Sequence, residues 1–236
     1  MKIITFSILF FYLFSAGATS VKRYTIGVED IPYMPFYQTS NGEFKGFAKE
    51  LLDAFAKDNN IEFEYIPLPV KRLFKEYLNP KKHIDFKFPD NHYWAQDLKG
   101  DMQLSYSHGL VQFTDGVLRL KKNINTPKET LKDLGILRGF TAWGYLEDVK
   151  SGKINLVGSN SLESLLKLGI RERVDGCFIN IDVAKYLLKN KIKKEGILFY
   201  DSSLPHTNSS YSLSTYQHHD IIKKLNKGKN CYCRWV

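Results

Sequence analysis

The chain has 236 residues, 43% of them hydrophobic, and a formal net charge of +9. Its lysines are scattered and are not interleaved with aromatic residues on one element, which argues against a nucleic-acid-binding protein. The three cysteines form no Cys-x-x-Cys pair and the six histidines do not cluster, so the sequence predicts neither a metal site nor a bound cofactor.

The first 18 residues have the pattern of a secretory signal peptide. A basic start at Lys2 precedes an almost wholly apolar stretch at residues 3–14, and the small residues Ala16 and Ala18 mark a cleavage site. The apolar stretch is too short for a comfortable membrane span. We therefore expect a mature protein that begins near Thr19 and is soluble outside the cytoplasm. An uncleaved N-terminal anchor is the alternative.

Strands and helices alternate in the first part of the mature chain. A first strand at residues 24–30 leads into a loop at residues 31–37 that carries two prolines and three aromatic residues. The next elements, in chain order, are a helix at 44–57, a strand at 61–66, a helix at 69–78 and a strand at 84–88. This order predicts a parallel, doubly wound sheet with right-handed crossovers.

The second part of the chain repeats the alternation. The predicted elements are strand segments at 102–106 and 116–120, a short helix and turn at 131–135, a helical stretch at 142–150, a strand at 154–158 and a helix at 162–170. A strand at 174–181 with its helix, strands at 197–200 and 211–215 and a helix at 217–226 complete the chain. We interpret these elements as a second α/β set that is inserted in the first.

Asp182 stands at the junction between the 174–181 strand and the helix that follows it. This is the position of a helix N-cap, and Asp is a favoured capping residue. It is also the carboxyl end of a strand, where ligands bind in open α/β sheets. Asp182 is therefore predicted either to cap its helix, or to cap it and contact a ligand. Cys177, within the apolar strand, is expected to be a buried free thiol.

Four stretches carry a resemblance to a known family. They are Tyr33-Met34-Pro35-Phe36 after the first strand, residues 42–51 at the first helix, residues 134–141, and residues 173–187. In this order behind a signal peptide, the chain resembles the family 3 extracellular solute-binding proteins, the periplasmic amino-acid-binding components of ABC importers. The resemblance runs from about residue 22 to about residue 225.

The resemblance implies an α/β fold of the two-lobed, type II periplasmic-binding-protein kind. Lobe 1 would comprise residues 21–111 and 215–236, lobe 2 residues 117–209, and the hinges residues 112–116 and 210–214. A ligand would be clamped between the lobes by hinge closure. The implied function is a monomeric, non-enzymatic receptor that captures a small polar, amino-acid-like ligand for an ABC permease or a membrane sensor.

The resemblance also implies candidate ligand contacts. Tyr33 matches the family aromatic residue that stacks on the ligand, and Asp182 matches the carboxylate that receives a ligand ammonium. Arg138 and Thr141 bracket a predicted anion seat of backbone N–H groups and a hydroxyl.

One departure from the family pattern affects the predicted ligand. The Thr-x-x-Arg motif, whose arginine grips the ligand α-carboxylate, is missing from residues 88–97. Arg72 is either a replacement for that arginine or a surface residue of its helix. Asp90, Asn91 and Trp94 lie on the loop expected at the cleft, and Tyr106 precedes the first hinge.

Two other functions remain open from the sequence. Some relatives catalyse dehydration of cyclic dicarboxylates, and titratable groups for such an enzyme could come from Glu29, Asp90, His92, Asp182 and His206. None of these residues belongs to a recognisable pair or triad, and no Gly-x-Ser-x-Gly motif is present, so no enzymatic activity is predicted. The missing arginine would also allow an interaction module that has lost ligand binding.

Overall fold

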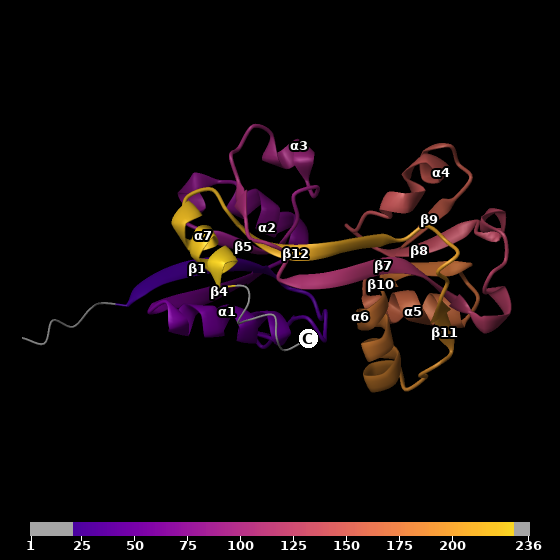
Figure 1. Ribbon diagram of the computed structural model, residues 1–236. Helices are drawn as coiled ribbons and strands as arrows, with labels where there is room; N and C mark the ends of the chain where they lie inside the picture. Colours follow the sequence, from indigo (N-terminus) through magenta and orange to yellow (C-terminus); the bar gives the residue numbers. More distant parts are fainter. Residues whose placement is uncertain (1–20, 229–236) are drawn as a thin grey trace, which may run out of the picture.

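The computed structural model describes residues 21–228. The predicted signal peptide, as well as Cys231 and Cys233, lies outside the described residues. Figure 1 shows two bodies joined by two long strands, β7 (Val111–Leu120) and β12 (Thr207–Thr215), which we call the crossing strands. No helix between residues 21 and 228 has both the length and the apolar character needed to span a bilayer.

The first body, here called the first lobe, combines the N-terminal elements with the last helix. Its strands are β1 (Lys22–Glu29), β2 (Gln38–Ser40), β3 (Glu43–Lys45), β4 (Ile61–Leu68), β5 (Phe86–Asp90) and β6 (Ser105–Tyr106). Its helices are α1 (Phe47–Asp58), α2 (Val70–Tyr77), the 3-10 turn η1 (Pro80–Lys82), α3 (Gln96–Lys99) and α7 (His219–Lys227).

The second lobe is built from one uninterrupted stretch of chain between the crossing strands. Its strands are β8 (Asp133–Leu137), β9 (Asn155–Ser159), β10 (Gly176–Asn180) and β11 (Leu198–Tyr200). Its longer helices are α4 (Leu146–Lys150), α5 (Leu162–Ile170) and α6 (Ile181–Leu187), which continues as the π-helical turn η5 (Leu188–Ile192). Three short 3-10 turns are η2 (Lys121–Asn123), η3 (Lys128–Thr130) and η4 (Trp143–Tyr145).

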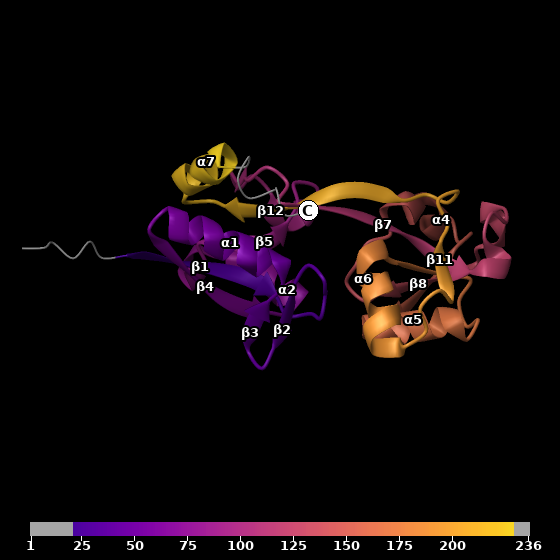
Figure 2. The same ribbon diagram turned by 60° about the horizontal axis from the view of Figure 1, so that its bottom comes forward.

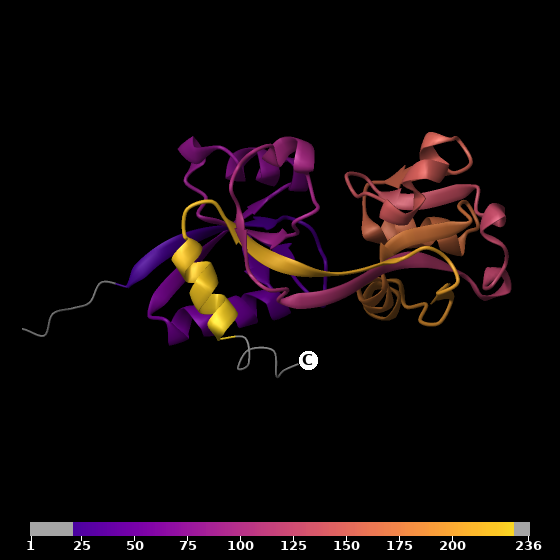
Figure 3. The same cartoon turned by 45° about the horizontal axis from the view of Figure 1, so that its top comes forward.

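A continuous path of strand pairing runs through both lobes, in the order β4-β1-β5-β12-β7-β10-β8-β9. Within each lobe three strands are parallel, and a crossing strand is added antiparallel to them. The crossing strands pair with each other from Thr207 opposite Asp115 to Tyr211 opposite Val111, and they run side by side between the lobes in Figure 3. The predicted α/β fold class is confirmed. The residue boundaries of lobes and hinges stay a prediction.

Helices cover both faces of the sheet in each lobe because their apolar stripes need a partner surface. In the first lobe, α1 and α7 pack on one face through residues such as Leu52 and Ile221, and α2 packs on the other through Leu73. In the second lobe, α5 and α6 cover one face and the α4 region covers the other. Figure 2 shows α5 and α6 together, with the β2–β3 hairpin projecting from the first lobe.

Two predicted elements differ in the structure. The short helix expected at residues 131–135 is wrong: this segment enters β8, which pairs in parallel with both β9 and β10. Its apolar residues Leu134 and Ile136 are buried, so a central-strand position outweighs the local turn signals. The strand expected at residues 102–106 is reduced to the two residues of β6. Cys177 is confirmed as a buried free thiol, and burial raises its pKa to about 12.

Candidate ligand-binding site

A cavity of about 440 Å³ lies where the two lobes and the crossing strands meet. The first lobe contributes Glu29, Tyr33, Tyr37, Val70, Lys71, Phe74, Trp94, Ala95 and Leu98. The crossing strands contribute Asp115 and Tyr211, and the second lobe contributes Gly139, Phe140, Thr141 and Trp143. Its size and its largely apolar lining suit a small molecule.

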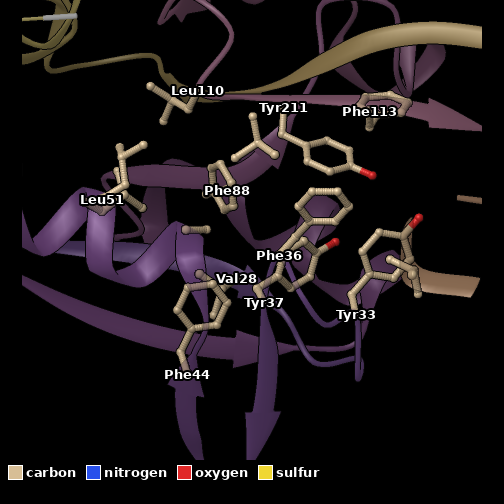
Figure 4. Packing of buried hydrophobic residues seen from close by; sticks show 14 of the residues in the cluster. Val28, Tyr33, Phe36, Tyr37, Phe44, Leu51, Phe88, Leu110, Phe113 and Tyr211 are labelled. Carbon is tan, nitrogen blue, oxygen red and sulfur yellow. The ribbon is translucent and has the colours of Figure 1, made fainter. Parts of the chain in front are cut away.

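Aromatic rings form most of the cavity wall. Tyr33 is only 2% exposed, stacks on Tyr37 at 5.2 Å between ring centroids, and reaches Phe140 of the second lobe at 6.0 Å. Tyr211 packs against both Trp94 (5.9 Å between ring centroids) and Phe113 (4.3 Å). Figure 4 shows Tyr33 and Tyr211 at the edge of the packed core, with their hydroxyl groups pointing away from the other labelled residues. Burial raises the pKa of both hydroxyls well above their usual range, so they stay protonated.

Glu29, at the end of β1, is a buried carboxyl group in this wall. Its Oε2 accepts a hydrogen bond of 2.7 Å from the Tyr37 hydroxyl. Burial raises the pKa of Glu29, and the positive charge of Lys87 and the Tyr37 hydrogen bond lower it in part. The Glu29 carboxyl group is therefore already engaged within the first lobe.

A buried ionic network lies behind the aromatic wall. Lys99 Nζ donates to Asp90 Oδ1 at 3.1 Å and to the Asn91 carbonyl at 2.7 Å. Lys87 Nζ lies 3.8 Å from Asp90 Oδ1 and 3.9 Å from the Phe74 ring centroid, and it donates to the Pro89 carbonyl. Two lysines thus face the carboxyl groups of Asp90 and Glu29 in a charge-balanced cluster.

Asp115 on β7 is the other acidic residue of the lining. Burial raises the pKa of its carboxyl group to about 7. Its register partner on β10 is Asn180, and a hydrogen bond from the Asn180 side chain lowers this pKa in part. Oδ1 of Asp115 and Nδ2 of Asn180 are both buried. Among residues 21–228, no cationic side chain contributes to the pKa of Asp115.

The fold and the position of this cavity can be compared with known proteins. No family model matches the chain, and no curated protein matches its sequence. Among solved structures, the arginine-, lysine-, histidine-binding protein ArtJ from Geobacillus stearothermophilus is 18% identical, with a TM-score of 0.67 over 89% of this chain and 89% of ArtJ. The chain has the two-lobed fold of periplasmic binding proteins.

Two further solved structures share this binding-protein fold. A histidine-bound ABC uptake transporter substrate-binding protein from Streptococcus pneumoniae is 20% identical, with a TM-score of 0.65 over 88% of this chain and 85% of its own. The periplasmic VFT2 domain of BvgS from Bordetella pertussis is 16% identical, with a TM-score of 0.67 over 89% and 87% of the two chains.

Three of the residues predicted to contact a ligand line the cleft of this binding-protein fold. They are Tyr33 on the loop after β1, Trp94 on the loop after β5 and Thr141 on the loop after β8. Each follows the carboxyl end of a parallel strand, which explains why the sequence order located them. Their contact with a ligand stays a prediction.

Three other predicted residues lie behind the wall. Asp90 is fully buried, holds Lys99 and accepts a 2.7 Å hydrogen bond from the Ser214 hydroxyl. The Asn91 side chain donates to Ser209 Oγ at 2.9 Å, and the Tyr106 ring lies 5.2 Å from Lys99 Nζ. Asp90, Asn91 and Tyr106 therefore lie behind the residues that line the cavity and are not part of the lining.

Arg72, Arg138 and Asp182 also lie outside the cavity lining. The Arg72 side chain is 63% exposed and pairs with Glu76 on the same helix at 2.6 Å, which fits the surface alternative. Two of the backbone N–H groups of the predicted anion seat at residues 138–141, those of Arg138 and Phe140, donate to the carbonyls of Ser159 and Leu137. The anion seat itself stays a prediction. The Asp182 side chain is 52% exposed and lies 3.6 Å from Lys185.

The predicted capping role of Asp182 is wrong. Asn180 caps α6, because its Oδ1 accepts hydrogen bonds from the backbone N–H groups of Asp182 (3.0 Å) and Val183 (3.1 Å). The helix therefore begins two residues earlier than the sequence suggested, and Asp182 belongs to its first turn.

Sequence reasoning did not identify several lining residues as ligand contacts: Glu29, Lys71, Asp115, Trp143 and Tyr211. The sequence did contain a signal for Asp115, since it is the only charged residue in the predicted hinge at residues 112–116. No group of three or more metal-ligating side chains gathers anywhere in the described part of the chain.

Proposed function

We propose that this protein is a family 3-type periplasmic solute-binding protein that captures a small polar ligand between its lobes for import or sensing. The observation that carries the proposal is the cavity itself, because its lining comes from both lobes and both crossing strands. A ligand in contact with all these parts favours the closed arrangement through its differential affinity, which is the basis of hinge closure.

The comparisons support the same function. ArtJ binds arginine, lysine and histidine, and the Streptococcus pneumoniae protein is the substrate-binding protein of an ABC uptake transporter. The Bordetella pertussis BvgS domain, which is described as periplasmic, shares the fold. We accordingly propose export by the N-terminal signal peptide, location in the periplasm, a monomeric state, and an ABC permease or membrane sensor as partner.

The proposed function is non-enzymatic, in line with the solved structures of this fold, whose names describe binding proteins. Two carboxyl groups around the cavity already have partners: Glu29 is held by Tyr37, and Asp90 is held by Lys99 and Ser214 behind the wall.

Lobe closure tests the proposal. Small molecules released from protein purified from its native periplasm would be identified by mass spectrometry and then added back to ligand-free protein. We expect the radius of gyration from small-angle X-ray scattering to decrease on saturation, because the hinges bring the lobes together. An unchanged radius of gyration at saturation would contradict clamping, and protein that releases no small molecule would favour an interaction module.

A further inference from the structure

The cavity offers aromatic faces from three parts of the molecule. Tyr33 comes from the first lobe, Tyr211 from a crossing strand, and Phe140 and Trp143 from the second lobe. Aromatic rings that surround a small volume attract cations through the negative potential of their faces. Phe74 and Trp94 lie elsewhere in the wall, and Lys87 Nζ already lies 3.9 Å and 5.8 Å from their ring centroids.

The charged groups of the lining are Glu29, Lys71 and Asp115. Glu29 accepts the Tyr37 hydrogen bond and interacts electrostatically with Lys87. Lys71 is exposed, so its charge is solvated. Asp115 differs from both, since it lines the cavity and its pKa is lowered only by the neutral side chain of Asn180, with no contribution from a cation among residues 21–228. Its negative charge adds to burial in raising the pKa of Tyr33 and Tyr211.

Apart from the exposed Lys71, the cationic side chains near the cleft have other partners. Arg72 pairs with Glu76 at the surface, and Arg138 Nε faces the Gly158 carbonyl at 3.5 Å. Lys87 and Lys99 are held by Asp90 and by backbone carbonyls. A ligand carboxylate would therefore meet no buried, unpaired cation among the lining residues. A ligand cation would instead meet the Asp115 carboxyl group, to whose pKa no cationic side chain among residues 21–228 contributes.

We propose that the cavity binds a small organic cation that lacks a carboxylate, such as an alkyl guanidinium or a quaternary ammonium, with its charge against Asp115 and its apolar part between Tyr33, Phe140 and Trp143. This inference rests on the proposed function and specifies its ligand class.

Calorimetric titration with two matched probes tests the ligand class. Agmatine and arginine share the guanidinium group and differ by the carboxylate, and choline adds a quaternary ammonium. We expect agmatine and choline to bind more tightly than arginine. Asp115→Asn should weaken binding of agmatine about tenfold to a hundredfold, because it removes a charge-assisted interaction and keeps the side-chain shape. Asp220→Asn, an exposed carboxylate on α7, is the matched control and should leave the affinity unchanged.

A second variant tests the aromatic part without the charge. Trp143 is 43% exposed, so Trp143→Leu should leave the melting temperature close to that of the wild type. We expect choline affinity to fall about twofold to thirtyfold, which is the range of a lost cation–π contact. Thermal unfolding of both variants without ligand shows whether either change acts through folding.

The outcomes separate this inference from the proposed function. Agmatine affinity that is equal in wild type and Asp115→Asn would overturn the role of Asp115. Binding of arginine but not agmatine, or no saturable binding of any of the three probes, would overturn the ligand class. In each case, lobe closure on the solute released from the native protein would still support a solute-binding protein. Failure of that solute to close the lobes would instead contradict the proposed function.

Discussion

The buried carboxyl group of Asp115 lowers the free energy of unfolding of the ligand-free protein when it is ionised. Burial raises the pKa of its carboxyl group from 3.8 to about 7. The folded state thus binds the proton more tightly than the unfolded state, so the free energy of unfolding falls as the pH rises from about 4 to about 7, and it stays lowered above that range. The difference between these two pKa values corresponds to about 4 kcal/mol.

Asp115→Asn should therefore stabilise the ligand-free protein at pH 8 and change its stability little at pH 4. Urea unfolding at the two pH values measures the difference, with Asp220→Asn as the control for loss of an exposed charge. A variant that is no more stable than the wild type at pH 8 would contradict the buried, ionisable state of Asp115. A gain in stability together with a loss of cation binding is the pattern expected of a residue retained for binding.

Individual site residues were predictable where they follow a strand end and unpredictable where they lie within a strand. Tyr33, Trp94 and Thr141 sit on loops whose place at the cleft follows from βα order alone. The directions of Asp115 and Tyr211 depend on the register of β7 with β12, and pairings between residues nearly 100 positions apart leave no local signal.

At the scale of elements, the junction of β10 and α6 shows how a short polar side chain can have two roles. Asn180 closes the strand in register with Asp115 and caps the helix through Oδ1. The predicted cap at Asp182 was displaced because both residues are good caps, and tertiary pairing of β10 fixes where the strand ends. Tertiary pairing also decides the structure of β8, because its pairing with β9 and β10 replaces the short helix that was predicted there.

Asn180→Ala should lower the free energy of unfolding by about 1–2 kcal/mol, because it leaves two backbone N–H groups of α6 without their acceptor. Asp182→Asn is the matched control and should change stability by less than about 0.5 kcal/mol, because its ion pair with Lys185 is exposed. Denaturant unfolding of the two variants compares them directly. A larger loss in Asp182→Asn than in Asn180→Ala would place the functional cap at Asp182.

For the whole molecule, alternation of strands and helices was sufficient to predict an α/β fold with one set of elements inserted in the other. The sequence did not reveal that the buried lysines of the first lobe would be balanced by Asp90 and Glu29, because that arrangement depends on packing of α2, α3 and β5 against each other. The apolar pattern decides the architecture, and side-chain geometry decides the chemistry of the cleft.

The insertion of the second lobe also sets an order of assembly. The first lobe is complete only when β12 pairs with β5, and β12 brings Leu213 and Ser214 into its interior from the far end of the chain. The second lobe has all of its parallel strands in one stretch, so its contacts close shorter loops and form sooner after synthesis. Until β12 arrives, β5 presents an open edge, which exposes the unfinished first lobe to aggregation.

A chain that ends at residue 206 should therefore keep a protected second lobe and lose protection in the first. Hydrogen exchange followed by mass spectrometry would show slow exchange in β8 and β10 and fast exchange in β1 and β5. Equal protection of β1 in the shortened and full-length chains would contradict this order. During synthesis, the first lobe of this protein stays incomplete until the last strand is made, and in that interval a chaperone would have the most exposed surface to protect.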